Sequence, residues 1–393
     1  MIRHSDNPRV VVLNSYCYSD RGCFDEFAST LGVFRAAGRH GYDITRVFPA
    51  DSVSEADRLR ALSDEYVRVE PLPANLWSPA VSRLRGLRKL LIGIEPNIVH
   101  VLGEAWQAGT LQALRAGRSL GAVPGLHFAE NGPGLGGGVG RIRKFLGKVV
   151  LDRASYAVGW SGDSIHVARD AWNWLGPTAV FPGIGVPREF FDAAKPLRER
   201  SAQVIFVGRL SEEKGVKDVL SLAVPLRERS VRVVVVGDGP LRSTVQLAHD
   251  NGLINYVGAT TRQNVARLMA DSLITLVPSR PGIMKSPKGA PLRVEEQFGM
   301  VIVESMASQT PVVAYRTGAI PEVMGQCGLL VERNTPALLV AVSSLLSDEQ
   351  LWMSHSKASA AHAKQYSEEA IAAKLSEFWR LRLEVPDCPH DGL

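Results

Sequence analysis

The chain has 393 residues, more than one ordinary compact core needs, so its length indicates two domains. Hydrophobic residues make up 45% of the sequence and charged residues 22%, which excludes an intrinsically disordered protein. The net charge is +5, and Lys and Arg form no dense runs, so the composition favours phosphorylated small molecules or an anionic membrane surface over nucleic acid.

Cysteine spacing and hydropathy predict the compartment. The four cysteines form no C-x-x-C pair and lack histidines at zinc-site spacing, so we expect free thiols in a reducing compartment; they are Cys17, Cys23, Cys327 and Cys388. The N-terminal residues run directly into a strand-like stretch without an apolar signal segment, and no apolar run reaches transmembrane length. These features predict a cytoplasmic protein, with peripheral contact to the inner face of the membrane as an extension.

Short β-branched runs alternate with helical patterns in the first half of the chain. This alternation is typical of parallel α/β layers. One helical pattern spans residues 26–41, where Gly41 stands at the expected helix end. The predicted strands are 9–16, 43–49, 97–102, 123–130 and 155–160.

A stretch rich in Pro, Gly and charge at residues 181–200 indicates a linker, after which the strand series restarts. We expect two doubly wound, Rossmann-like α/β domains that face each other across a cleft. The expected boundaries are 1–185, 196–365 and a C-terminal helix and tail, 366–393, that packs back on the first domain. The second strand series is 203–210, 231–239, 254–260, 273–279 and 311–317.

A cationic loop follows the first strand of the second series. The strand ends at Gly208, and Arg209 and Lys214 follow on the connection to a helix. Arg as a fork and Lys as a mobile point charge are suited to a diphosphate. Taken alone, the pair is equally compatible with two solvated surface charges.

The segment "EQFGMVIVE" combines a helix start with two carboxylates. A helix beginning near Gly299 leaves the N–H groups of Gly299, Met300 and Val301 unpaired, which makes an anion site. Glu304 lies more than one turn further on and is suited to a vicinal diol such as ribose, and Glu296 to sugar hydroxyls. The alternative is an ordinary core helix in which Glu304 pairs with an arginine.

Together these segments resemble a known family. "E-x-F-G-x-x-x-x-E" at Glu296–Glu304, "SMASQTPVVAYRTGAIPEV" after it and "VGRLSEEKG" at residues 207–215 resemble the signature of retaining GT-B glycosyltransferases, family 4 (glycosyl transferases group 1). "FPGIGVPREFF", "VVVVGDGP", "INYVGAT" and "DSLITLVPS" resemble further landmarks in the expected order. The match covers residues 180–335 and is thinner before residue 180.

The resemblance implies a GT-B fold in which the second domain binds a nucleotide-sugar, with UDP- or GDP-sugars favoured. Arg209 and Lys214, beside Gly208, would hold the donor diphosphate. Glu296 and the amides that open the next helix would position the donor sugar, and Glu304 would bind the ribose. No D-x-D motif is present, so we expect no metal and no cofactor.

The first domain, expected on the acceptor side, departs from the family pattern. The loop after its first strand contains only Gly22 where relatives often carry two glycines, so it either approaches the donor phosphate or serves the acceptor. After the strand near residue 123, Glu130 and Asn131 are expected at the cleft, as in relatives with an "EN" pair. Strand alternation places His127 on the opposite face from Glu130. His127 is either a core histidine or an acceptor-side catalytic residue.

The sequence does not decide the role of two loops and two basic patches. The glycine-rich residues 132–140 and residues 280–295 are each either a lid or an exposed loop; the second carries Lys285, Lys288 and Arg293. The basic patches lie beside apolar stripes and would rest on an anionic membrane or face solvent. They comprise Arg83, Arg85, Arg88 and Lys89, then Arg141, Arg143, Lys144 and Lys148.

The sequence therefore predicts a retaining, metal-independent, front-face glycosyltransferase with a hydroxyl-bearing acceptor, whether glycan, lipid or secondary metabolite. The main alternative is a non-hydrolysing nucleotide-sugar epimerase of the same architecture. A dinucleotide-dependent oxidoreductase is a weaker alternative, because the G-x-G near residue 237 is followed by Pro240 and lacks a third glycine. A regulatory nucleotide-sugar sensor would not need both glutamates and both cations.

Overall fold

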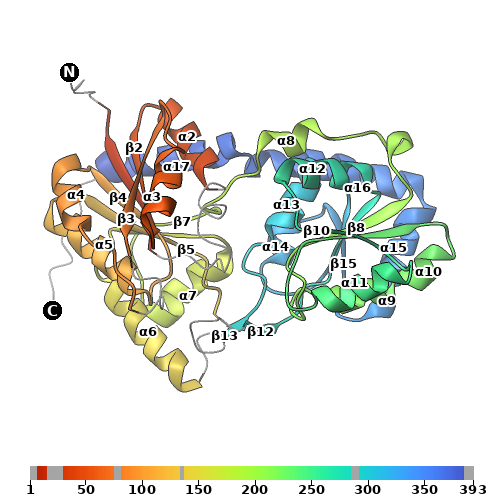
Figure 1. Cartoon of the computed structure of the whole chain (residues 1–393). Coiled ribbons are helices and arrows are strands. Elements are labelled where there is room, and N and C mark those ends of the chain that lie inside the picture. The colour runs from red at the N-terminus through yellow and green to blue at the C-terminus, as the bar shows by residue number, and fades with distance from the viewer. Residues whose placement is uncertain (1–6, 16–29, 75–80, 133–136, 285–291, 385–393) are drawn as a thin grey trace. The chain divides into compact units, whose positions relative to one another are not determined.

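The computed structural model describes residues 7–15, 30–74, 81–132, 137–284 and 292–384. They form two compact units (Figure 1). The first unit contains the described residues up to Gly185 together with the C-terminal helix α17 (Glu368–Glu384). The second contains Val186–Met284 and Leu292–Ser367. Each unit is an open, parallel, doubly wound sheet covered by helices, which confirms the predicted fold class.

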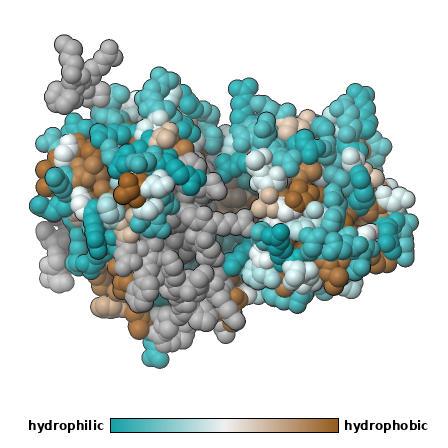
Figure 2. Space-filling view, in the orientation of Figure 1, coloured by the Kyte–Doolittle hydropathy of each residue, from teal (hydrophilic) through white to brown (hydrophobic). Residues whose placement is uncertain are grey.

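The visible surface of both units is dominated by hydrophilic residues, with apolar ones scattered between them (Figure 2). No helix in the described part of the chain is long and apolar enough to cross a membrane.

The first unit is built on seven parallel strands in the order β3-β2-β1-β4-β5-β6-β7. The order reverses between β1 and β4, and that reversal is the topological switch point of an open α/β sheet. The five strands predicted from the sequence are confirmed, and β3 and β7 were missed. The strands are β1 (Arg9–Asn14), β2 (Asp43–Ala50), β3 (Val67–Pro73), β4 (Ile98–Leu102), β5 (Val123–Phe128), β6 (Tyr156–Gly159) and β7 (Thr178–Val180).

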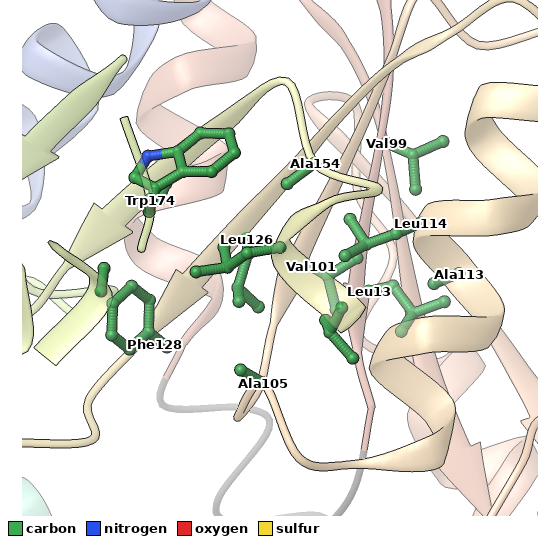
Figure 3. Close-up of a cluster of buried hydrophobic side chains, with 14 of the residues drawn as sticks. Leu13, Val99, Val101, Ala105, Ala113, Leu114, Leu126, Phe128, Ala154 and Trp174 are labelled. Carbon is green, nitrogen blue, oxygen red and sulfur yellow. The ribbon is translucent and has the colours of Figure 1, made fainter. Parts of the chain in front are cut away.

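One face of this sheet carries the main hydrophobic core. Leu13, Val101 and Leu126 from neighbouring strands meet Leu114 from α5 and the ring of Trp174 (Figure 3). Burial of these side chains, at about 25 cal/mol per Å² of apolar area, holds the helical layer onto the sheet. The helices of the layer are α4 (Leu87–Ile94), α5 (Ala108–Ser119), α6 (Gly137–Leu151) and α7 (Gly162–Trp172).

The opposite side of the first sheet is covered by α2 (Leu31–Arg39) and α17, which lie beside each other (Figure 1). Helix α3 (Val53–Arg60) packs at β2 and β3. Ile371, Leu375 and Trp379 on α17 are fully buried, so the last helix is part of this unit's core. Two acids, Glu368 and Glu369, occupy its first turn, where they complement the helix dipole.

The second unit has six parallel strands in the order β10-β9-β8-β11-β14-β15, so its switch point lies between β8 and β11. The five predicted strands are confirmed. The edge strand β15 and the antiparallel hairpin β12–β13 were missed. The strands are β8 (Gln203–Val207), β9 (Arg232–Val236), β10 (Asn255–Gly258), β11 (Ile274–Val277), β12 (Gly282–Met284), β13 (Leu292–Val294), β14 (Val312–Tyr315) and β15 (Gly328–Val331).

Side-chain caps begin several helices of the second unit. Thr261, Asn334 and Asp348 each accept a hydrogen bond from the backbone three residues on, which satisfies a donor that the helix leaves unpaired. The helices are α8 (Arg188–Asp192), α9 (Val216–Ser221), α10 (Ala223–Arg227), α11 (Arg242–Asp250), α12 (Arg262–Asp271), α13 (Met300–Ala307), α14 (Ile320–Met324), α15 (Thr335–Ser347) and α16 (Glu349–Ala363).

Candidate functional site

The candidate site of the second unit lies at its switch point. Strands β8 and β11 are hydrogen-bonded neighbours in the centre of the sheet, and their connections diverge to opposite sides. The connection after β8 carries Arg209 and Lys214, and the connection after β11 carries Ser279. Ligands of open α/β sheets bind beyond the carboxyl ends of such strands, so the topology places these residues where a ligand is expected.

One carboxylate oxygen of Glu296 accepts two hydrogen bonds. Lys214 Nζ lies 2.6 Å from Glu296 Oε2, and Ser279 Oγ donates to the same oxygen over 2.8 Å. Burial disfavours the charge of Glu296, but the Lys214 ammonium and the Ser279 hydroxyl outweigh it, so the pKa of Glu296 lies below its ordinary value. The two residues predicted from separate motifs are therefore in direct contact, and Ser279 is a contact that sequence reasoning missed.

Helix α13 begins beside this group, as predicted. Its N-cap is Gly299, whose φ of 88° lies in the left-handed region that favours glycine. A Cβ at Gly299 would also approach the Ile302 side chain to 2.9 Å. Within the described residues, the N–H groups of Gly299, Met300 and Val301 donate to no protein acceptor. Three aligned donors and the positive end of the helix dipole make this end able to bind an anion.

Glu304 lies one turn along α13 and is half-buried. Burial raises the pKa of Glu304 to about 7; the charge of Arg262 opposes the rise and the charge of Glu189 adds to it. Among the residues that the structure describes, its carboxylate has no hydrogen-bond partner. The alternative of a carboxylate neutralised by a contacting arginine is not what the structure shows.

Arg209 differs from Lys214, although both follow β8. Its side chain is exposed and makes no hydrogen bond or ion pair within the described parts of the chain. The preceding residue, Gly208, donates its N–H to the carbonyl of Val236, which ties the start of the loop to β9. Arg209 is thus a solvent-facing cation on an anchored loop.

The predicted acceptor-side glutamate of the first unit is held in a buried ion pair. Glu130 follows β5, and its carboxylate pairs with Arg143 of α6, both side chains being less than 10% exposed. The Arg143 guanidinium also lies 4.6 Å from the centroid of the Trp106 ring. Glu130 Oε1 accepts the Gly132 N–H over 3.1 Å, and Asn131 is half-buried between them.

A second carboxylate, Glu104, joins this group and was missed by sequence reasoning. Its two oxygens accept the N–H groups of Ala129 and Glu130 over 3.2 and 3.1 Å. Burial and the neighbouring Glu130 charge raise the pKa of Glu104. Glu104 follows the central strand β4, so its place at a switch-point strand was the signal available in the sequence.

His127 is a fully partnered core residue. Its Nε2 lies 2.9 Å from the carbonyl of Phe181, and its Nδ1 lies 3.2 Å from His100 Nε2. Because a carbonyl only accepts, Nε2 of His127 carries the proton and Nδ1 accepts from His100. Burial lowers the pKa of His127 to about 4, so the ring is neutral. Neither nitrogen is left for a ligand, which favours the core alternative.

Several predicted residues lie outside the described residues. They include Gly22, Lys285 and Lys288, and the side chain of Arg293 is likewise not described. The two lid predictions therefore remain predictions, but their loops are shorter than expected: α6 begins at Gly137, inside 132–140, and the strands β12 and β13 occupy part of 280–295. In the described part of the chain, no group of three or more His, Cys, Asp and Glu side chains could hold a metal ion.

Comparison with known sequences gives a partial match. Residues 201–348 match the family model described as "Glycosyl transferases group 1". A D-inositol 3-phosphate glycosyltransferase of Corynebacterium glutamicum is 38% identical over 87 residues, which is 21% of this chain and 21% of the relative. The chain thus matches about a fifth of the length of this curated relative.

Comparison with solved structures covers nearly the whole chain. HepE of Anabaena, in complex with UDP, has a TM-score of 0.70 at 18% identity over 95% of this chain and 100% of HepE. A glycosyltransferase from Rickettsia africae has a TM-score of 0.72 at 16% identity over 97% of this chain and 100% of that protein. At this level of identity the likeness shows the fold alone, and that fold is the two-sheet GT-B fold predicted from the sequence.

Proposed function

We propose that this chain is a glycosyltransferase that moves a sugar from a nucleotide-sugar to a hydroxyl-bearing acceptor, with retention at the anomeric carbon and without a metal. The observation that carries the proposal is the convergence of Lys214 Nζ and Ser279 Oγ on Glu296 at the switch point, beside the α13 amides that have no acceptor among the described residues. The match of residues 201–348 to glycosyl transferases group 1 covers the same residues.

The charges define the mechanism. When the donor's anomeric C–O bond breaks, negative charge collects on the departing diphosphate. Preorganised donors that face this charge stabilise the transition state more than the bound donor. Lys214, Arg209 and the N-terminal amides of α13 supply such donors, in the place that Mg²⁺ takes in metal-dependent enzymes. The acceptor oxygen attacks from the face that the diphosphate leaves.

Glu296 and Glu304 hold different parts of the donor in this proposal. Glu296, kept ionised by Lys214, accepts hydrogen bonds from the donor sugar's hydroxyls. Glu304 has two oxygens without a partner in the described structure, which is what a ribose diol requires. The neighbouring structure of HepE contains UDP, so a UDP-sugar is the first donor to test, with GDP-sugars next.

Glu130 and Asn131 are the proposed acceptor-side residues. The ion pair with Arg143 fixes the Glu130 side chain, as a positioning group does for a working carboxylate. The acceptor is a glycan, lipid or secondary metabolite. The comparisons give the epimerase alternative no support.

The first test removes the central contact. Lys214→Ala and Glu296→Gln are each expected to lower transfer to acceptor by at least about 100-fold, because each removes a group that acts on the donor. Lys217→Ala is the matched control: this exposed lysine on α9 pairs with Glu212 and should leave turnover unchanged. Donors are first selected by thermal shift with UDP-, GDP-, ADP- and dTDP-sugars, and transfer is measured by product mass.

Near-normal turnover of either variant would refute the assignment. Efficient C2 epimerisation of a nucleotide-sugar without an acceptor would replace the proposed reaction by the epimerase one. The anomeric configuration of the product, read by NMR coupling, decides between retention and inversion.

Peripheral membrane contact is a second part of the proposal. On α6, Ile142 and Phe145 are 61% and 67% exposed and alternate with the exposed cations Arg141, Lys144 and Lys148. Apolar side chains flanked by cations are suited to an anionic lipid surface.

The neighbouring helices add to the basic surface of this layer. Between α4 and α5, a pocket of about 440 Å³ is lined by Arg83, Arg88 and Arg115. Helices α4, α5 and α6 cover the same face of the sheet, so both features belong to one helical layer.

Vesicle flotation tests the membrane contact. The protein should bind vesicles that contain phosphatidylglycerol and not pure phosphatidylcholine vesicles, and the double substitution Ile142→Ser/Phe145→Ser should lower binding about tenfold or more. Leu247→Ser, at an exposed leucine of the second unit, is the control. Equal binding of wild type and double variant would contradict this part of the proposal and leave the transfer reaction unaffected.

A further inference from the structure

The two connections that carry Lys214 and Ser279 are joined outside the candidate site. The N–H of Arg280 donates to the carbonyl of Glu213 over 2.8 Å. Glu213 precedes Lys214, and Ser279 precedes Arg280. This main-chain hydrogen bond therefore joins the two connections next to the residues that meet on Glu296.

Two glycines allow these connections to approach so closely. A Cβ at Gly215 would lie 2.0 Å from the carbonyl oxygen of Pro278, and the φ of Gly215, 70°, also favours glycine. A Cβ at Gly282 would lie 2.5 Å from Glu213 Cβ. The turn before α9 and the residues after β11 are thus in contact on both sides of the Arg280–Glu213 bond.

The side chain of Arg280 extends this junction to three further elements. Its Nε donates to Asp218 Oδ2 on α9 over 2.7 Å, and its guanidinium lies 5.0 Å from the centroid of the Tyr315 ring at the end of β14. Thr335, the first residue of α15, donates to the other oxygen of Asp218 over 3.0 Å. The hydrogen bond to Asp218 also raises the pKa of Arg280, so the arginine stays charged.

We propose that Arg280 is a positioning residue for the reaction: its side chain, held by Asp218 and the Tyr315 ring, fixes the two connections that its main chain joins at Glu213, so that Lys214 and Ser279 meet on Glu296. We call Arg280, Asp218, Glu213, Tyr315 and Thr335 the Arg280 clamp. The inference rests on the proposed function, because it concerns the same donor site. Arg280 itself acts through Lys214 and Ser279 and not on the donor.

The clamp predicts a particular kinetic defect. Displacing Lys214 by about 1 Å is expected to lower kcat by about 100-fold. KM for the donor should change by less than about threefold, because the lost stabilisation belongs to the charge that develops on departure. Arg280→Lys, which retains the cation and one donor for Asp218, should recover part of the rate lost in Arg280→Ala.

The pH dependence of kcat distinguishes a displaced Lys214 from a mere loss of stability. Lys214 and Ser279 keep the pKa of Glu296 below its ordinary value, so the activity that needs ionised Glu296 is lost only at low pH. When Lys214 is displaced, burial remains and the pKa of Glu296 rises. The acidic limb of the kcat profile should therefore move to higher pH in Arg280→Ala and stay in place in a variant that is only less stable.

The experiment combines kinetics with a crystal structure of Arg280→Ala. Support requires the drop in kcat, the displaced acidic limb and Lys214 Nζ moved away from Glu296 Oε2, where it lies at 2.6 Å in the wild type. Asp218→Asn tests the same clamp if Arg280→Ala does not fold. Arg267→Ala is the matched control: it removes an exposed arginine of the same unit that pairs with Asp271 and should change neither kcat nor the limb.

The outcomes separate the clamp from the proposed function. Lys214 still on Glu296 in Arg280→Ala, with kcat within about threefold of wild type, would overturn the clamp. If Lys214 is displaced in Arg280→Ala but sugar transfer is unchanged, Arg280 does position Lys214, and the proposed role of Lys214 in the reaction is refuted. If the wild type transfers no sugar, the crystal structure alone still decides whether Arg280 holds Lys214.

Discussion

At the scale of single residues, the sequence and the structure both single out Glu304 as a candidate ligand-binding residue. In the sequence it is a carboxylate in a largely apolar helix, which is unfavourable without a partner. In the structure the carboxylate is half-buried, has no partner within the described residues, and has its pKa raised to about 7 by burial. A partly buried carboxylate without a partner and with a raised pKa does not stabilise the fold, and such groups are typical of binding sites.

The raised pKa predicts how nucleotide affinity depends on pH. An ionised Glu304 accepts both ribose hydroxyls, so affinity should fall as the pH drops through about 7. Arg262→Gln should move this midpoint to higher pH, because the arginine charge lowers the pKa; Glu189→Gln should move it to lower pH. Calorimetric titration with UDP between pH 5.5 and about pH 8.5 measures the midpoints.

The free nucleotide titrates equally in every such experiment, so the displacement between variants reports on Glu304 alone. Glu304→Gln should bind UDP at least about tenfold more weakly at pH 8 and lose the dependence on Glu189 and Arg262. Identical midpoints in the wild type and in both charge variants would contradict the assignment of Glu304 to the ribose.

At the scale of elements, the C-terminal helix α17 is held onto the first sheet by a chain of neutral polar groups. Trp379 Nε1 lies 3.2 Å from Tyr156 Oη and 3.3 Å from His100 Nδ1, and the Tyr156 hydroxyl lies 2.8 Å from His100 Nδ1. His100 continues the chain to His127 and thus to the strand that ends before Glu130. Burial lowers the pKa of His100 well below its ordinary value, so the chain is uncharged.

Trp379→Phe should destabilise the first unit by more than the loss of ring volume. The substitution removes the indole N–H and leaves the buried Tyr156 hydroxyl oxygen without this donor, at about 1–2 kcal/mol. Trp172→Phe is a matched control, because Trp172 is equally buried in the same unit and its Nε1 has no partner in the described structure. Urea unfolding of both variants, followed by near-UV circular dichroism, gives the comparison. Equal urea midpoints of the two variants would show that the hydrogen-bonded polar groups around Trp379 do not stabilise the unit.

At the scale of the whole molecule, the chain builds two similar sheets and uses its last helix in the first of them. It leaves the first unit at Gly185, within the Pro- and Gly-rich stretch, and returns at Glu368. Both sheets have their switch point next to the first strand of the unit, and both place their candidate residues after central strands. The same topological rule therefore locates the proposed donor residues and the Glu104–Glu130 group.

Much of this architecture could be predicted from the sequence. The central strands are β-branched runs such as those of β1 and β9, buried on both faces, and their hydrophobicity alone identifies them. The missed strands are marginal: β7 has three residues and β15 has four, and β3 contains two prolines. Edge strands pair with only one neighbouring strand and bury few side chains in the core, so their sequences show a weak hydrophobic pattern.

The proposed donor-site residues were also predictable, because each of them lies in a short sequence motif. Glu296, Gly299 and Glu304 occupy one helix and its approach, so helical geometry fixes their order. Lys214 follows a recognisable strand. The fold class, the strand series and the start of α13 therefore follow from local pattern and hydrophobicity.

The tertiary structure decided the contacts between distant residues. Lys214 and Glu296 are 82 positions apart, and Arg280 and Asp218 are 62 apart, so no local pattern relates them. The same holds for Glu130, whose side chain is fixed by Arg143, and for His127, whose two ring nitrogens are taken by Phe181 and His100. The sequence determines which segments form strands and helices, since hydrophobic periodicity is local. Which side chains share one oxygen depends on strand order and on close backbone approach, and these exist only in the folded chain.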